Sequence, residues 1–469
     1  MSLFYLDWLG IIPECFFGLA LLFYFCFGIE KEKESPVSEL SFQAQLVGLW
    51  VLVLLVNQWY LVQTTNWYFL FLNSYVVDEW SLCWKILVIL FTFFYVSFLK
   101  DISFEYLVLI LLFQFAVFFL LSSYHFLIFY LSLELSSFIL YLLVGSKRES
   151  LASTEGGLKY FVLGSFSSII LLFGIVLCYG LVGSLNFLDL YLWSFGSDSL
   201  SFWVAVLFIF VGIFFKLGVA PFHFWLPDVY NGSTWSVVYF LVVVSKIGIL
   251  GTFLRFIYVV GLEGFESFSF LFSWLALTSL VVGTLGAVKQ TSLKRLVAYS
   301  GISHMGFIFF GLASGTGFGL IATLSYFLIY LLLNSIWIVV MWSNKDDHLE
   351  SLQNLYPWLV FFLTVTMFSI AGVPPLSGFF MKFYLLFSLI QVSNYLGGFF
   401  LVLFSVISAF YYLRIIRVMY FSSSLEGISK TRMDCNMSGF WFLILLVYLV
   451  IFFVFFQKYL FGFLFSYLG

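Results

Sequence analysis

The chain consists almost entirely of apolar runs of about twenty residues or more, separated by short polar breaks. A run of this length is what an α-helix needs to cross about 30 Å of hydrocarbon. Hydrophobic residues make up 63% of the chain and charged residues only 9%, whereas soluble domains are about 25% charged. The runs are therefore too frequent to be the cores of soluble domains, and the sequence predicts a single integral membrane domain over residues 1–469.

The apolar runs predict an all-α polytopic membrane protein with about 14 transmembrane helices. The runs are apolar on all sides, which excludes barrel strands, because those would alternate polar and apolar residues. The predicted helices cover residues 8–28, 42–63, 79–98, 104–122, 124–145, 157–183, 200–230, 233–257, 268–288, 295–314, 318–342, 356–391, 394–420 and 438–466.

The positions of Lys and Arg test this assignment, because loops on the cytoplasmic or matrix side carry most of these residues. On the fourteen-helix count, the even-numbered loops hold only Arg255, at a helix end. The odd-numbered loops hold Lys31, Lys33, Lys100, Lys147, Arg148, Lys159, Lys289, Lys294, Arg295, Lys345, Arg414, Arg417, Lys430 and Arg432. The asymmetry supports the count and places both termini on the side opposite the Lys- and Arg-rich loops.

Composition also excludes several classes of function. The five cysteines are scattered without a C-x-x-C pair, so neither an iron–sulfur cluster nor a zinc site has its usual ligand spacing. A net charge of −3 is too small to indicate nucleic-acid binding. We expect no cleavable presequence, because the chain runs from Met1 straight into an apolar segment that contains Pro13 and Glu14.

Ionisable side chains lie deep inside several predicted helices: Glu134, Lys216, Lys246 and Lys382. A charge at the centre of a membrane helix costs about 2.5–3.5 kcal/mol, so these groups need partners, water or both. Burial disfavours the charged form of lysine and a neighbouring carboxylate favours it, so such a lysine can exchange a proton, whereas arginine stays protonated. The alternative is a set of static ion pairs that fix helix packing. Lys85 and Lys458 lie nearer to helix ends and are expected to snorkel to the interface.

A short sequence occurs twice beside these lysines. Gly218-Val219-Ala220-Pro221 in the seventh predicted helix reappears as Gly372-Val373-Pro374-Pro375 in the twelfth. Both helices are too long for a single straight crossing, and an internal proline breaks a helix. The copies are five helices apart, so they cross in opposite directions, as in an inverted repeat with broken helices near the midplane. We therefore expect a three-helix segment at 1–100, five-helix repeats at 104–257 and 268–420, and a final helix at 438–469.

Four stretches resemble the antiporter-like membrane subunits of respiratory complex I. They are "KLGVAPFHFWLPDVYNGS", "VSKIGIL", "SLKRLVAYSGISHMGFIFFG" and "AGVPPLSGFFMKFYLL". The resemblance implies a core membrane-arm subunit of a proton-pumping NADH:quinone oxidoreductase that binds no cofactor itself. It implies that Glu134 pairs with Lys216, that Lys246 relays the proton, and that Lys382 connects to the exit side.

Two histidines and an aspartate extend this set. His304 in "GISHMGF" is either a relay group toward Lys382 or a packing residue. His223 lies just past Pro221 and is a candidate to line a hydrated path. Asp228 is interpreted as a loop or cap residue near the inner surface. "GTGFG" at Gly315 is interpreted as a simple turn, because it joins two helices with no strand before it.

The resemblance also implies partners and a location. NADH, FMN, iron–sulfur clusters and quinone are expected in other complex I subunits, while this chain contacts neighbouring membrane-arm subunits, lipid, protons and water, and no nucleic acid. The 66 phenylalanines and the expected lack of a presequence favour the mitochondrial inner membrane, with a bacterial plasma membrane or thylakoid membrane as alternatives. Two other functions stay open: a cation/proton antiporter without a redox partner, and a structural subunit that does not pump.

Overall fold

A computed structural model describes residues 8, 10–31, 37–65, 68–98, 103–147, 149–196, 200–260, 268–342, 347–421, 437–453 and 455–457. Nearly all of these residues are helical, which confirms the predicted all-α class. A short hairpin of β1 (Tyr68–Leu70) and β2 (Tyr75–Val77) is the one sheet within them, with Tyr68 opposite Val77 in antiparallel register.

Within the described ranges, eleven helices are long and apolar enough to cross a membrane, and four shorter apolar helices accompany them. Each of the fourteen predicted ranges overlaps one of these helices or both halves of a broken one. Length alone does not make the four shorter helices spans, so the count of fourteen stays a prediction. The predicted last helix, residues 438–466, overlaps α20 (Met437–Ile451), and its residues 454 and 458–466 lie outside the described part.

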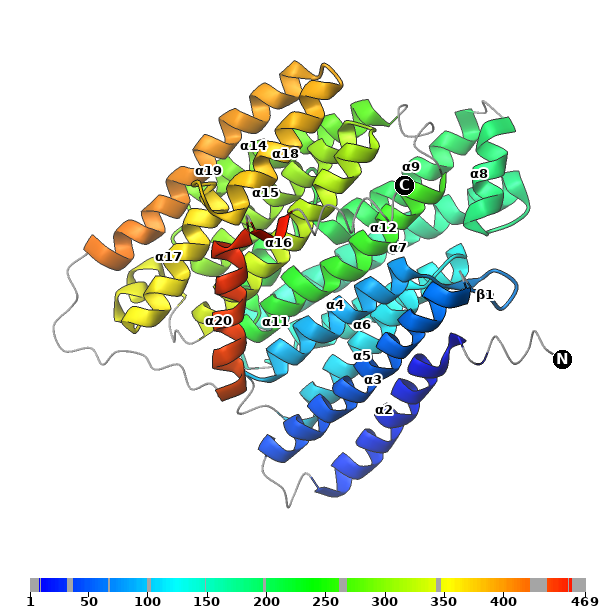
Figure 1. Cartoon of the computed structure of the whole chain (residues 1–469), viewed down its shortest axis with the longest axis horizontal. Coiled ribbons are helices and arrows are strands. Elements are labelled where there is room, and N and C mark those ends of the chain that lie inside the picture. Colours follow the sequence, from blue (N-terminus) through cyan, green and yellow to red (C-terminus); the bar gives the residue numbers. More distant parts are fainter. Residues whose placement is uncertain are drawn as a thin grey trace. The chain divides into compact units, whose positions relative to one another are not determined.

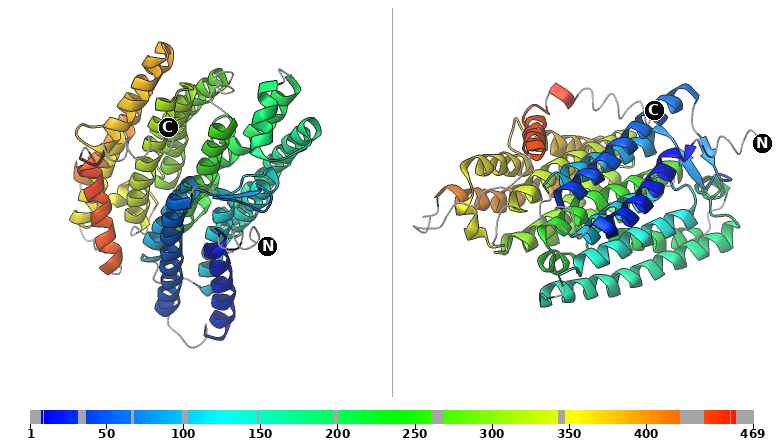
Figure 2. Two further views of the ribbon diagram at one scale, coloured as in Figure 1. Left: turned by 45° about the vertical axis from the view of Figure 1, so that its right-hand side comes forward. Right: turned by 90° about the horizontal axis from the view of Figure 1, so that it is seen from below.

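The chain forms two compact units. The first comprises Met1–Ser146, Phe161–Lys216 and Val244–Val260. In it, α2 and α3 pack on each other and both contact α5, as Figure 2 shows for the blue helices. Its helices are α2 (Ile12–Lys31), α3 (Val37–Thr65), α4 (Glu79–Val96), α5 (Phe104–Leu121), α6 (Phe126–Val144), most of α7 (Leu151–Val182), α8 (Phe187–Gly196), all but the last residue of α9 (Leu200–Leu217) and α12 (Ser245–Val260).

The second unit comprises Lys147–Tyr160, Leu217–Val243 and Gly261–Gly469. Its helices α14 and α15 lie side by side (Figure 1), because a Cβ at Gly283 would come 2.5 Å from the backbone nitrogen of Ser303, and only glycine permits that approach. Its elements are α10 (Leu226–Gly232), α11 (Trp235–Tyr239), most of the π-helix η1 (Phe240–Val244), α14 (Ser269–Val288), α15 (Leu293–Ala313), α16 (Gly317–Trp342), η2 (Leu349–Asn354), α17 (Pro357–Ala371), α18 (Ser377–Gln391), α19 (Tyr395–Phe421) and α20.

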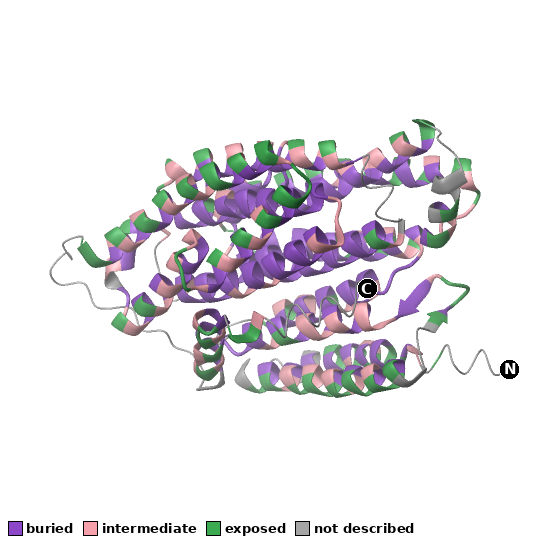
Figure 3. Cartoon of the chain, turned by 45° about the horizontal axis from the view of Figure 1, so that its top comes forward, coloured by how far each residue is buried: buried purple, intermediate pink, exposed green. Residues whose placement is uncertain are grey.

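Burial differs sharply between helices of the second unit. Nearly every described residue of α15 and α16 is buried, whereas α19 is exposed along one side. Figure 3 shows this contrast between purple helices and helices striped with green. A helix that is apolar on all sides and buried on all sides belongs to the interior of a bundle, while the exposed apolar side of α19 is suited to lipid or to a partner subunit.

Both predicted helix breaks are present. The seventh predicted helix divides into α9 and α10, and the twelfth into α17 and α18. Gly218 and Gly372 follow the last residues of α9 and α17 with φ of 72° and 93°. Glycine takes up this left-handed conformation without a Cβ penalty and so ends a helix, and the prolines beyond it cannot continue the helix.

The compact units do not follow the predicted repeats. Lys147–Tyr160 and Leu217–Val243 fall within 104–257 in the sequence but join the second unit in the fold. Helix packing therefore divides the chain at different positions from those that the repeated Gly-Val-x-Pro sequence predicts. The two five-helix repeats stay a prediction.

Candidate functional site

Glu134, Lys216 and Tyr141 form a triad in the first unit, in which Lys216 and Tyr141 are buried and Glu134 is partly exposed. Glu134 and Tyr141 lie seven residues apart on one face of α6, and Lys216 lies in the last turn of α9. The Lys216 Nζ is 3.9 Å from Oε1 of Glu134 and donates a hydrogen bond of 3.1 Å to the hydroxyl of Tyr141. It also lies 5.5 Å from the centre of the Tyr141 ring. The predicted pairing of Glu134 with Lys216 is therefore present.

The two charged groups of this ion pair lie near each other but form no hydrogen bond. A separation of 3.9 Å is longer than a hydrogen bond, and Oε1 of Glu134 has no hydrogen-bond partner among the described residues. The Lys216 side chain is 2% exposed and that of Glu134 is 29% exposed. The charge of Lys216 is thus stabilised by a carboxylate, a hydroxyl, an aromatic ring and the carbonyl end of its own helix.

Lys246 is the second residue of α12, and it is buried. The π-helix η1 ends two residues before it, within an otherwise continuous apolar helix. Single π-helical turns are rare and occur frequently at functional sites. This irregularity was not predicted, because Phe240–Val244 is a plain run of apolar residues with no glycine or proline.

Lys382 lies in α18 of the second unit, opposite the end of α17. Its Nζ donates hydrogen bonds of 2.9 Å and 3.0 Å to the carbonyl oxygens of Ile370 and Ala371. It also lies 5.3 Å from the centre of the Phe307 ring. The last carbonyls of a helix have no partner within it and carry partial negative charge. Lys382 is therefore held by backbone oxygens that the helix break exposes.

His304 is fixed by two tyrosines of the same unit. Its Nδ1 lies 2.7 Å from the hydroxyl of Tyr326, and its Nε2 lies 3.0 Å from the hydroxyl of Tyr412. His304 and Lys382 also line one small cavity of about 20 Å³, together with Tyr326 and Tyr330. A cavity needs roughly 10–15 Å³ to hold a water molecule. The cavity that both residues line therefore has room for about one water.

His223 and Asp228 take other positions. His223 is half-buried in the break after α9, and its ring packs against Phe224 at 4.7 Å. The structure shows no ion pair of His223 within the described ranges. Asp228 lies in the first turn of α10 and its carboxylate binds Lys159 at 2.9 Å. The interpretation of Asp228 as a loop or cap residue was wrong, because it lies inside α10, whose N-cap is Trp225, and its carboxylate forms an ion pair.

The prediction that Lys85 snorkels to the interface was wrong. Its side chain is 0% exposed, and its Nζ lies 2.5 Å from Oε1 of Glu14. Snorkelling is unnecessary where a buried carboxylate compensates the charge. Lys458 lies outside the residues that the structure describes.

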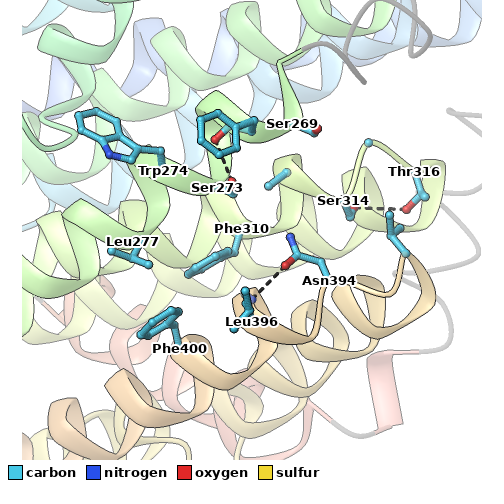
Figure 4. Close-up of a pocket in the computed structure, with 15 residues that line it drawn as sticks. Ser269, Ser273, Trp274, Leu277, Phe310, Ser314, Thr316, Asn394, Leu396 and Phe400 are labelled. Carbon is cyan, nitrogen blue, oxygen red and sulfur yellow. Dashed lines mark hydrogen bonds between the residues drawn. The ribbon is translucent and has the colours of Figure 1, made fainter.

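No group of three or more His, Cys, Asp and Glu side chains that could hold a metal ion occurs in the described part of the chain. A separate cavity of about 800 Å³ lies between the start of α14, the end of α15 and the start of α19 (Figure 4). Its lining includes Trp274, Phe310, Asn394 and Phe400, but no ionisable side chain. The predicted site residues of the second unit lie elsewhere.

A family model described as NADH:quinone oxidoreductase/Mrp antiporter, TM, matches residues 123–410, more than half of the chain. NADH-quinone oxidoreductase subunit N of Pelagibacter ubique is 35% identical over 435 residues, covering 89% of this chain and 90% of that protein. NADH-ubiquinone oxidoreductase chain 2 of Marchantia polymorpha is 34% identical, covering 97% and 96%. The chain belongs to this family. All six predicted site residues lie within the matched range.

Solved structures agree with the fold. A chain of respiratory complex I from Thermus thermophilus superposes with a TM-score of 0.81 at 26% identity, covering 96% of this chain and 98% of that one. A chain of an archaeal membrane-bound sulfane sulfur reductase gives 0.85 at 19% identity, which shows a shared fold alone. The chain is thus a multi-pass membrane protein of the antiporter-like type.

Sequence reasoning missed the tyrosines. Tyr141 had a usable signal, because it lies seven residues after Glu134 on the same helical face. Tyr326 and Tyr412 had none, since each is far from His304 along the chain. The pair of Glu14 and Lys85 was missed for the same reason.

Proposed function

We propose that the chain is a core membrane-arm subunit of proton-pumping NADH:quinone oxidoreductase, and that it carries a proton-translocation path. The observation that carries the proposal is the open ion pair of Glu134 and Lys216, at 3.9 Å beside a break in the helix. Membership of the NADH:quinone oxidoreductase/Mrp antiporter family supports it.

The distance between Glu134 and Lys216 controls whether Lys216 keeps its proton. While Glu134 is near, the charged form of Lys216 is favoured, because the carboxylate offsets the cost of burial. When redox chemistry in neighbouring subunits widens the gap, Lys216 loses this support and releases its proton. Tyr141 keeps the ammonium group in place during the change, since its hydroxyl accepts a hydrogen bond. The proton then passes to Lys246, His304 and Lys382.

We place NADH, FMN, iron–sulfur clusters and quinone in partner subunits. The sequence supports this, because its five cysteines are scattered without a C-x-x-C pair. Other membrane-arm subunits, lipid, water and protons are the partners of this chain. Its content of 66 phenylalanines supports the mitochondrial inner membrane as its location.

Replacing Lys216 tests the proposal. Lys216→Met and Glu134→Gln should each lower the number of protons pumped per NADH in the assembled complex, reconstituted into vesicles. Lys294→Met is the matched control, because Lys294 forms an ion pair with the partly exposed Asp347. If Lys216→Met and Glu134→Gln both assemble fully and pump as the unmodified complex does, the pair is structural and the proposal is wrong.

A cation/proton antiporter without a redox partner is the competing function, because the matching family model also covers Mrp antiporters. The two functions differ in their partners. Copurification of the chain with an NADH-oxidising, quinone-reducing assembly supports the oxidoreductase, whereas cation-dependent proton exchange without such an assembly supports the antiporter.

A further inference from the structure

Hydroxyl groups from three helices of the second unit are hydrogen-bonded in series through His304. The hydroxyl oxygen of Tyr326 on α16 lies 2.7 Å from Nδ1 of His304, and that of Tyr412 on α19 lies 3.0 Å from Nε2. The hydroxyl of Tyr412 is also hydrogen-bonded to that of Ser300, which lies one helical turn before His304 on α15. All of these side chains are buried. The hydroxyl chain consists of Tyr326, His304, Tyr412 and Ser300.

The two distances at the imidazole indicate which group donates in each hydrogen bond. Hydroxyl donors favour separations of about 2.7–2.8 Å, whereas N–H donors favour about 2.9–3.0 Å. A neutral imidazole has one donor nitrogen and one acceptor nitrogen, so its two hydrogen bonds run in the same direction along the chain. The contacts of 2.7 Å and 3.0 Å therefore fit donation from Tyr326 to Nδ1 and from Nε2 to Tyr412.

The far end of the hydroxyl chain has the same direction. Oγ of Ser300 donates to the carbonyl oxygen of Val297 at 2.9 Å. A serine hydroxyl has a single proton, so the oxygen of Ser300 acts as the acceptor toward Tyr412. Ser300 lies four residues, or about 6 Å, nearer than His304 to the start of α15. Successive donors therefore lead from Tyr326 toward the end of α15 that carries Lys294 and Arg295.

The near end of the hydroxyl chain lies at the cavity of Lys382. Tyr326 and His304 line this cavity of about 20 Å³ together with Lys382, and it has room for about one water. A water in this cavity can accept a proton from the ammonium group and donate one to the tyrosine hydroxyl. The hydroxyl chain therefore begins where a proton released by Lys382 would arrive.

We propose that the hydroxyl chain is a second route for protons, which leads from the cavity of Lys382 toward the start of α15. The oxygen of Tyr326 takes up a proton from the cavity while its own proton moves to Nδ1 of His304. The proton on Nε2 moves to Tyr412, the proton of Tyr412 moves to Ser300, and the proton of Ser300 leaves the chain. Each hydroxyl again has one proton and the imidazole is neutral, so one proton has crossed and the direction of the hydrogen bonds has reversed. The proposal rests on the proposed function, since the protons are those that the complex translocates.

The competing explanation is that the hydroxyl groups only satisfy the hydrogen bonds of a packing histidine. Replacing tyrosine by phenylalanine removes the hydroxyl and retains the ring, so it separates the two explanations. A packing role predicts less assembled complex but an unchanged number of protons pumped per NADH in the complexes that do assemble. A proton route predicts a lower number in the assembled complexes.

The first experiment measures protons pumped per NADH in reconstituted complexes with Tyr326→Phe, Tyr412→Phe or both. Because the groups act in series, we expect each single variant and the double variant to lose the same fraction of pumped protons as His304→Asn. The control is Tyr24→Phe, which removes a buried hydroxyl that donates to the carbonyl oxygen of Leu40 at 3.2 Å in the first unit, and it should pump normally. If either single variant assembles and pumps as the unmodified complex does, the proposal is wrong.

The second experiment measures the tautomer of His304 and requires no tyrosine variant to assemble. The chain has only four histidines, so nitrogen NMR of isotope-labelled histidine in the full chain, in detergent micelles, resolves few signals, and His304→Asn identifies those of His304. We expect Nε2 to carry the proton and Nδ1 to carry none. A protonated Nδ1, alone or together with Nε2, contradicts the assigned direction and overturns the proposal.

The results also distinguish the hydroxyl chain from the proposed function. A lower proton number in Lys216→Met together with an unchanged number in both tyrosine variants overturns only the hydroxyl chain. An unchanged number in both Lys216→Met and Glu134→Gln overturns the proposed function itself.

Discussion

Gly372 determines where the carbonyl oxygens that bind Lys382 point, and replacing it tests that dependence. Its φ of 93° and ψ of 40° lie in the left-handed region, where a Cβ costs about 1–2 kcal/mol. A Cβ there would also come within 3.3 Å of Cδ and 3.4 Å of Nζ of Lys382. That side chain is flexible and can move by a few tenths of an ångström, so backbone strain dominates. We expect Gly372→Ala to lower the free energy of unfolding by about 2 kcal/mol, roughly a thirtyfold change in the unfolding equilibrium.

A series at this position sharpens the test. Asparagine tolerates the left-handed region better than alanine, and a β-branched residue tolerates it worst. Stability should therefore fall in the order Gly, Asn, Ala, Val, measured by denaturing-detergent titration of the full chain in mixed micelles. Gly317→Ala is the control in the same unit, because nothing lies within 4 Å of its Cβ position. If alanine at 372 is as stable as glycine, or asparagine is no better than alanine, the break does not depend on the left-handed conformation.

Two further predictions concern packing and pH. Gly283→Ala should destabilise the chain by about 1–3 kcal/mol in the same titration, since its Cβ would meet the backbone nitrogen of Ser303, which cannot move aside; Gly180→Ala, with open space around it, should not. His125 caps α6 by accepting from the backbone nitrogen of Leu127 at 3.1 Å, and burial lowers its pKa below the ordinary 6.5. Because the unfolded chain then binds more protons, stability should fall as the pH drops below about 6.5. His125→Asn keeps a cap and should abolish this dependence.

The helix breaks could be predicted from the sequence because their causes are local. Gly218 and Gly372, each followed within three residues by proline, identify the ends of α9 and α17 without any knowledge of packing. The depth of Glu134 and Lys216 in apolar runs was likewise visible, because a buried charge needs a partner. These features depend on residues within one or two helical turns. Both helix breaks and the ion pair of Glu134 with Lys216 are present in the structure.

Features that depend on distant residues could not be predicted. The carboxylate that neutralises Lys85 comes from Glu14, 71 residues earlier, and no local pattern links them. The hydroxyl that binds Nε2 of His304 comes from Tyr412, 108 residues later. The same limit applies to the two units, whose three segments each are interleaved along the chain. A pattern within one helix predicts which face is polar, but it does not identify the helix that faces it.

Lys216 and Lys382 are stabilised by different chemistry, and this difference predicts how each can be regulated. Lys216 depends on a carboxylate that lies 3.9 Å from its Nζ. A small increase in this distance therefore weakens the stabilisation of the charged form of Lys216. Lys382 has two backbone carbonyls as its hydrogen-bond acceptors, and these move only when the end of α17 moves. Side-chain motion therefore suffices to control the first lysine, whereas the second responds to the geometry of the helix break. Gly372 is accordingly the position where a change outside the ionisable groups should alter the behaviour of Lys382.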